Sequence, residues 1–176
     1  MNHINHEAIH YFVESQVVNG YHDGSFRPAQ TITRAEATKL TMASFKPIAV
    51  IQGIKNDLLA QNQELFADVD PLDWYAPYVF LAAQQGFISG YKDHTFRPHD
   101  TIRFAEGLKL IFNTYHLAIP AYAPMPDRLI ATSSDWYVPY FSEALKRHII
   151  NPDQYYHPSQ RMTRGNFWRY CIALKC

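Results

Sequence analysis

The sequence has no excess charge of either sign, no long hydrophobic run and few cysteines. In a chain of 176 residues, 16 basic and 16 acidic side chains cancel, and no block of five or six like charges occurs. Nonspecific binding of nucleic acid needs such a positive field, so we expect no nucleic-acid partner. The apolar runs are far shorter than the roughly 20 residues that cross a bilayer, so we expect a soluble chain without membrane insertion.

Two further absences concern cysteine and the start of the chain. Cys171 and Cys176 are the only cysteines, and both lie at the end of the sequence. They cannot join distant segments, and their spacing suits neither a disulfide within a helix nor a zinc knuckle. No basic stretch followed by an apolar one comes after Met1, so the chain as given shows no export signal.

Aromatic residues, in contrast, are abundant. They make up 15% of the chain, with 12 Tyr, 11 Phe and 3 Trp, and apolar residues together reach 47%. This composition is typical of one globular domain with a substantial core. The rings exceed what a core of this size requires, and we expect some of them to face a ligand.

The chain contains internal repeats. Residues 20–40 and 90–110 share 12 identities in 21 positions without a gap. The hexapeptide at residues 73–78 returns at 135–140 with only its fourth residue changed. A weaker third copy of the turn and second helix follows at residues 155–164. Repeats of this size bury their apolar faces by stacking on one another, so we expect three units that share one core.

Each unit has the pattern of a helix, a turn and a second helix, which predicts an all-α fold. We expect the first helix of the middle unit to begin at Asp73 as N-cap, to tolerate Pro77 in its first turn and to stop near Gly86. The following Gly, Asp and Pro residues predict a fixed turn. In that turn Phe26, or Phe96 in the second copy, can enter the core.

The second helix of each unit has the clearest start signal. In the first unit, Thr33 and Glu36 have the spacing of a capping box, in which each side chain satisfies a free backbone amide. In the middle unit a periodic apolar face follows, which we assign to the core. Its members are Ala105, Leu108, Ile111, Phe112 and Tyr115.

These patterns divide the chain into three repeats and two linkers, all within one structural unit. The segments are repeat 1 (residues 1–46, N-terminally incomplete), a linker with an extra helix at 51–63 (47–64), repeat 2 (65–117), a proline-rich linker (118–128) and a degenerate repeat 3 (129–176).

The order of motifs closely resembles the S-layer homology (SLH) domain. The resemblance covers most of the chain and rests on Phe66-x-Asp68-Val69, Trp74-Tyr75-x-x-Tyr78-Val79, Gly90-Tyr91-x-Asp93, Phe96-Arg97-Pro98 and Ile32-Thr33-Arg34-Ala35-Glu36. The resemblance implies three tandem copies in a pseudo-threefold helical spindle. It also implies clefts between the copies that hold a secondary cell wall polymer, often one with a pyruvate ketal on an amino sugar.

The family's characteristic arginine maps onto Arg34 and, in a degraded motif, onto Arg164. In the middle repeat Phe104 takes its place and Arg103 comes one residue early, a rotation of about 100° on a helix. Asn166 stands where repeat 1 has Glu36, and Ile4 stands where repeat 2 has Trp74. These departures favour one complete cleft, at Arg34.

The residue chemistry fits such a ligand independently of the resemblance. A ketal carboxylate is a planar anion that an arginine fork matches, and Tyr and Trp offer flat faces for sugar C–H groups. We therefore expect ligand contacts from Arg34, Arg164, Arg103, Tyr21, Asp23, Tyr91, Asp93, Trp74, Trp136 and Arg97.

A purely structural interpretation stands beside this one for several of these residues. Glu36 and Glu106 are better explained as helix caps. The two tryptophans are expected to pack between repeats, and Arg97 to hold its own turn together. Arg34 is harder to explain structurally, because a cation at a helix N-terminus opposes the macrodipole.

One motif favours an enzyme. His6-Glu7-Ala8-Ile9-His10 fits the H-E-x-x-H signature of zinc proteases. The third ligand is missing at the extended spacing, and the motif falls in the first helix of a repeat whose other copies carry no ligands there. We therefore expect no catalysis, no cofactor and no metal, with a zinc hydrolase as a minor alternative.

The sequence thus predicts a non-catalytic module that anchors a protein to an anionic wall glycan. The main alternative is a protein–protein assembly module of a surface layer that has lost glycan binding. Because the resembled family acts outside the cytoplasm, we expect an extracellular location at the cell surface or wall, with the chain as given being a mature fragment.

Overall fold

The computed structural model describes residues 23–61, 65–130 and 135–174. Within these ranges the chain is helical and forms isolated backbone bridges but no strand, so the predicted all-α class is confirmed. The helices are α2 (Arg34–Phe45), α3 (Ile48–Gln61), α4 (Ala76–Gln84), α5 (Phe104–Thr114), α6 (Val138–Lys146) and α7 (Arg164–Ile172). None of them is long and apolar enough to cross a membrane.

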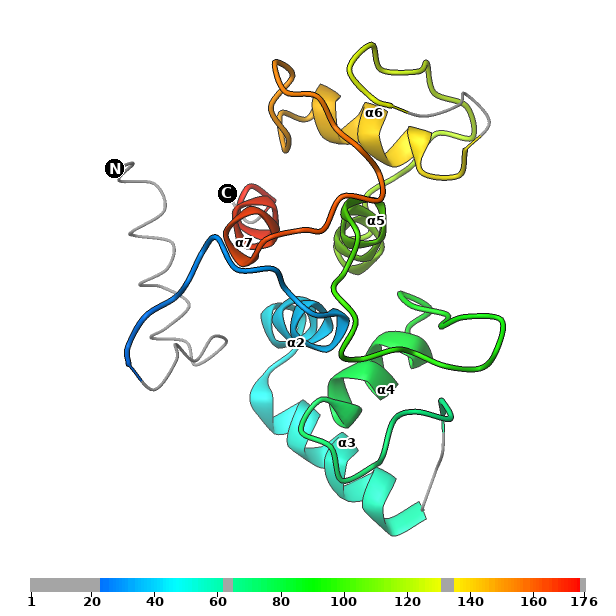
Figure 1. Ribbon diagram of the computed structural model, residues 1–176. Helices are drawn as coiled ribbons and strands as arrows, with labels where there is room; N and C mark the ends of the chain where they lie inside the picture. The colour runs from blue at the N-terminus through cyan, green and yellow to red at the C-terminus, as the bar shows by residue number, and fades with distance from the viewer. Residues whose placement is uncertain (1–22, 62–64, 131–134, 175–176) are drawn as a thin grey trace.

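The second helices of the three repeats form the centre of the molecule. Figure 1 shows α2, α5 and α7 grouped in the middle and seen nearly end-on, with α3 and α4 on one side and α6 on the other. Helix α4 contacts α2, and α6 contacts α5, so each outer helix packs on the central helix of the preceding repeat. Helix α3 lies in the interval where the sequence predicts an extra helix, and it packs on α4.

A closed ring of backbone hydrogen bonds joins the three repeats. The Ile32 amide donates to the Met162 carbonyl at 3.1 Å, the Met162 amide to the Ile102 carbonyl at 3.0 Å, and the Ile102 amide to the Ile32 carbonyl at 3.0 Å. Each residue lies two positions before a central helix and is almost fully buried. The pseudo-threefold arrangement therefore rests on matched backbone contacts as well as on similar sequences.

A second set of cyclic backbone bonds, which runs in the opposite sense around the repeats, involves the first turn of each central helix. The first amide of each helix donates to a carbonyl in the turn of the next repeat around the ring. These bonds are each 2.8 Å long and run from Arg34 to Asp100, from Phe104 to Gln160 and from Arg164 to Gln30. Amides at a helix start have no partner within the helix, so each repeat here satisfies donors of its neighbour.

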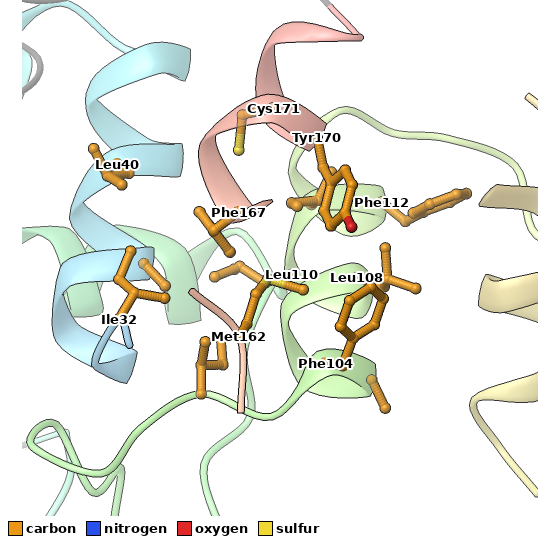
Figure 2. Packing of buried hydrophobic residues seen from close by; sticks show 14 of the residues in the cluster. Ile32, Leu40, Phe104, Leu108, Leu110, Phe112, Met162, Phe167, Tyr170 and Cys171 are labelled. Atoms are coloured by element: carbon orange, nitrogen blue, oxygen red, sulfur yellow. The ribbon is translucent and has the colours of Figure 1, made fainter. Parts of the chain in front are cut away.

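The core lies between the central helices (Figure 2), where side chains of α2, α5 and α7 point toward one another. Three equivalent positions in this core hold Ala37, Gly107 and Phe167, and all three are buried. A Cβ atom at Gly107 would lie 2.8 Å from the Met162 Sδ and 3.5 Å from the Phe167 ring. The missing side chain at Gly107 thus makes room chiefly for the Met162 side chain, and the Phe167 ring lies at ordinary contact distance.

The predicted second-helix start is confirmed, and the predicted first-helix start is wrong. Thr33 and Glu36 form the capping box of α2. Helix α4, however, has Tyr75 rather than Asp73 as its N-cap. The Asp73 carboxylate instead accepts the Tyr75 hydroxyl at 2.6 Å, and the Asp73 carbonyl closes a turn by accepting the Ala76 amide. This turn uses two residues that the sequence pattern assigns to the helix.

The end of α4 follows the expected pattern. Gly86 has a φ of +73°, a left-handed conformation that glycine adopts readily. Its amide donates to the Ala83 carbonyl, and the next amide, from Phe87, donates to the Ala82 carbonyl. These two bonds form a Schellman motif, which confirms Gly86 as the helix stop.

Removing repeat 3 is expected to abolish cooperative unfolding. Deletion of residues 129–176 removes Met162 from the ring and Phe167 from the core, and it leaves the first amide of α5 without its acceptor. The truncated protein should therefore lose the single sharp thermal transition in circular dichroism that we expect of the whole chain. A sharp transition at an unchanged temperature would mean that the repeats fold independently.

Candidate functional site

A partly open cleft lies between repeats 1 and 2. Its walls come from the start of α2, the turn before α5, the outer side of α5 and Trp136, which precedes α6. The hollow has about 630 Å³ of empty space, solvent at its mouth included. The predicted site residues Arg34, Tyr91 and Trp136 all line it.

Arg34 is held firmly in the wall of this cleft. Its Nε–H donates to the Phe96 carbonyl at 2.8 Å, and its Nη1 lies 3.4 Å from Glu106 Oε2. The guanidinium carbon lies 4.8 Å from the centre of the Tyr91 ring and 4.9 Å from that of Phe96. Only 11% of the side chain is exposed. The anion that compensates Arg34 at its helix N-terminus is therefore a residue of the neighbouring repeat.

Glu106 connects the cap of α5 to the cleft. One of its oxygens accepts the Arg103 amide at 3.0 Å, as expected of a capping glutamate, and the other accepts the Tyr91 hydroxyl at 2.9 Å. Burial, which outweighs the opposing effect of the nearby Arg34 charge, raises the pKa of Tyr91. Tyr91 is therefore a neutral donor near pH 7. The capping interpretation of Glu106 is correct but incomplete, because the same carboxylate also faces Arg34.

The turn that carries Tyr91 is braced by Asp93 and Arg97. Asp93 Oδ2 accepts from Arg97 Nη2 at 2.9 Å, and the Thr95 hydroxyl donates to Asp93 Oδ1. The Arg97 guanidinium lies 4.1 Å above the Tyr91 ring, and Asp68 accepts the backbone amides of Phe96 and Arg97. Asp93 and Arg97 do not line the cleft, and their contacts match the expected role of Arg97 in holding its own turn.

Other predicted site residues lie elsewhere. Asp23 and Arg27 form the corresponding pair in repeat 1, at 2.9 Å. Arg103 is exposed and joins repeat 3 through a backbone bridge to Arg161, outside the cleft. Tyr21 falls outside the described residues, as do His6 and His10 of the zinc-protease motif. In the described part of the chain, no group of three or more His, Cys, Asp or Glu residues could hold a metal.

The contacts of Arg34 recur at the interface between repeats 3 and 1. Arg164 donates from Nε to the Phe26 carbonyl at 3.2 Å, and its Nη1 lies 3.0 Å from Glu36 Oε1. Its side chain is 9% exposed. The departure at Asn166 does not affect this arginine, because its carboxylate partner belongs to the next repeat. The structure thus contains two equivalent Arg–Glu interfaces. The sequence motifs, taken one repeat at a time, predict only one complete cleft, at Arg34.

The interface between repeats 2 and 3 is built differently. Phe104 occupies the arginine position there and is 3% exposed. Its ring centre lies 5.4 Å from that of Phe141, 5.1 Å from Tyr156 and 5.7 Å from Tyr170. Aromatic packing replaces the ion pair, so this interface has no arginine at the cleft position.

Each of the two Arg–Glu interfaces also carries a lysine beside a tryptophan. Lys109 Nζ lies 5.3 Å from the centre of the Trp136 ring, and Lys39 Nζ lies 5.5 Å from that of Trp74. Trp136 is 52% exposed and Trp74 50%, so neither is packed fully between repeats. The sequence-based prediction missed both lysines, although they align with each other in the longest repeat.

Asp93 should titrate well below an ordinary carboxyl. Hydrogen bonds from the Thr95 side chain and then from Arg97 lower its pKa from 3.8 to about 2. Since the folded-state pKa is depressed, the contribution of this group to stability is present above about pH 4 and is lost as the pH falls toward 2. Carbon-detected NMR should give a midpoint near 2, and Arg97→Ala should move it up. A wild-type midpoint near 3.8 would contradict the bracing role.

Gly90, at the start of the same turn, should not tolerate alanine. It has a φ of +67°, and a Cβ atom there would lie 2.4 Å from the Phe66 ring and 2.8 Å from the Thr95 carbonyl oxygen. Gly90→Ala should lower the free energy of unfolding by about 2 kcal/mol or more through left-handed strain and overlap. Gly86→Ala is the matched control, since Gly86 has a φ of +73° with nothing within 4 Å. It should cost about 1 kcal/mol; equal losses in denaturant unfolding would rule out the overlap.

Comparison with known proteins adds independent information about the family. The sequence model of the S-layer homology domain matches residues 2–38 and 65–106. A cellulosome-anchoring protein of Acetivibrio thermocellus is 35% identical over 105 residues, which cover 59% of this chain and 22% of that protein. The middle cell wall protein of Brevibacillus brevis is 29% identical over 119 residues, or 68% of this chain and 11% of that protein.

An exoglucanase, XynX of Acetivibrio thermocellus, is similar over a longer stretch. It is 30% identical over 168 residues, which cover 90% of this chain but 14% of the enzyme. The chain thus spans less than a quarter of the length of each of these relatives. The two matched segments contain the helix starts and turns that form the cleft, and we conclude that this chain belongs to the S-layer homology family.

Proposed function

We propose that this chain is a non-catalytic cell-wall anchoring module that binds an anionic secondary cell wall polysaccharide, bearing pyruvate ketals, in clefts between adjacent repeats. The observation that carries the proposal is the composition of the first cleft. Arg34 and Lys109 contribute two cations against the single carboxylate of Glu106, and half-exposed Trp136 lies at one side. A net positive hollow beside a flat indole suits an anionic sugar.

The relatives support the same function. One is named a cellulosome-anchoring protein and another a cell wall protein, while similarity to the exoglucanase covers only a small part of that enzyme. A segment shared by an anchoring protein, a cell wall protein and an enzyme is better explained by a common attachment role than by a common reaction. On this basis we place the module outside the cell, at the cell surface or wall.

The second candidate is a protein–protein assembly module. The interface around Phe104 favours this candidate, because aromatic side chains fill the position where a third cleft would lie. The duplicated Arg–Glu–Lys–Trp arrangement favours glycan binding instead, because packing between repeats alone does not require half-exposed tryptophans at both interfaces.

Binding to purified bacterial cell walls should depend on the secondary polymer and on Arg34. The wild-type chain should sediment with intact walls and lose most binding when the polymer is removed. Arg34→Ala should weaken binding about tenfold or more, since it removes a charged donor and leaves Glu106 facing the anion. Arg34→Lys should recover part of the loss, and added salt should weaken binding throughout.

Arg103→Ala is the matched control for this experiment. It removes the same charge from the neighbouring helix start but from an exposed side chain outside the cleft. It should bind walls like the wild type, and thermal unfolding should confirm that each variant is folded. Equal binding of intact and stripped walls by the wild type would reject the glycan proposal and favour protein assembly.

A further inference from the structure

The Arg34 guanidinium is already occupied by protein groups. Its Nε–H donates to a backbone carbonyl, Nη1 faces Glu106, and its flat faces lie over two aromatic rings. Because Arg34 and Glu106 have opposite charges, their effects on a ligand largely cancel. The uncompensated positive charge of the cleft therefore lies on Lys109.

The third interface indicates that the arginine and glutamate are structural partners. Arg34 pairs with Glu106 and Arg164 pairs with Glu36, each across two repeats. At the remaining interface both members are absent together, because Phe104 stands at the arginine position and Asn166 at the glutamate position. This joint replacement is what an inter-repeat ion pair requires, since losing one member would leave a partly buried charge without its partner.

The two lysines, in contrast, are not paired with any carboxylate that the structure describes. Neither Lys39 nor Lys109 forms an ion pair within the described part of the chain. Each instead lies over a half-exposed indole, at 5.5 Å and 5.3 Å. A cation held only by a partly exposed ring is readily drawn to an incoming carboxylate. The lysine lines the first cleft together with the tryptophan, so both can meet one ligand.

We infer that Lys109 and Lys39 are the residues that bind the polysaccharide's carboxylate, while Trp136 and Trp74 receive the apolar face of the same sugar. This inference rests on the proposed glycan function. Arg34 and Arg164 are then positioning residues, which hold the glutamate and the turn so that the lysine carries the free charge. A lysine lies over an indole at similar distances at both Arg–Glu interfaces, so both interfaces present the same pair.

The test measures whether the contribution of the two lysines to wall binding depends on the ketal carboxylate. The probe is purified bacterial cell wall whose polymer bears pyruvate ketals, used before and after mild acid removes the ketals. Wild-type binding should fall about tenfold or more on ketal removal. The double variant Lys39→Gln/Lys109→Gln should bind the untreated wall about tenfold or more weakly, and ketal removal should then change its binding less than twofold.

Two further variants distinguish the effect of the lysine charge from the effects of lysine position and of protein stability. Lys55→Gln/Lys146→Gln removes two exposed lysines outside the first cleft and should respond to ketal removal like the wild type. Lys39→Arg/Lys109→Arg keeps the charge and should retain dependence on the ketal. Thermal unfolding of the Lys39 and Lys109 variants should match the wild type, because neither lysine forms an ion pair among the described residues. Lys55→Gln/Lys146→Gln removes the pair of Lys146 with Glu143 at 3.8 Å, but a pair with so exposed a lysine contributes little, so this variant should also remain folded.

The outcomes distinguish this inference from the proposed function. If the wild type binds the untreated wall and responds to ketal removal, but Lys39→Gln/Lys109→Gln responds equally, the carboxylate contact belongs to another residue and the inference is wrong. If the wild type binds neither wall, the glycan function itself fails. If binding is strong but unaffected by ketal removal in every protein, the ligand is a different part of the wall and the inference is again overturned.

Discussion

The ring of backbone hydrogen bonds through Ile32, Ile102 and Met162 is the constraint on which the rest of the structure depends. It sets the first turn of each central helix against the turn of the next repeat. Helix-start amides, which would otherwise need water or a capping side chain, are satisfied by that turn. The side chain at the first helical position is thereby directed into an interface between repeats, and both Arg34 and Arg164 occupy such a position.

Much of this fold could be predicted from the sequence because its signals are local. The capping box of Thr33 and Glu36, the stop at Gly86 and the apolar face of α5 each depend on residues within a few positions of one another. The start of α4 was missed for a related reason. Asp73 suits an N-cap, but its carboxylate accepts the Tyr75 hydroxyl instead, and spacing alone does not distinguish the two uses.

The interior of the site was harder to predict because its partners come from different repeats. Arg34 lies 72 positions before Glu106, and Arg164 lies 128 positions after Glu36. Which repeat follows which around the ring is a property of the closed structure, and a repeat alignment treats each unit in isolation. An alignment of single repeats therefore sets Asn166 against Arg164, although the carboxylate that pairs with Arg164 is Glu36 of repeat 1. Lys39 and Lys109 are identical in the alignment, but without the tryptophans beside them they have the pattern of ordinary exposed lysines.

The first cleft combines residues from all three repeats. Arg34 comes from repeat 1, Tyr91 and Lys109 from repeat 2, and Trp136 from the start of repeat 3. No single repeat can assemble this wall, so a ligand that fills it binds only the closed arrangement. By mass action such a ligand stabilises the closed ring over any state in which the repeats separate. Attachment through clefts between repeats therefore reinforces the packing on which the clefts depend, whereas a site within one repeat would leave the other interfaces unaffected.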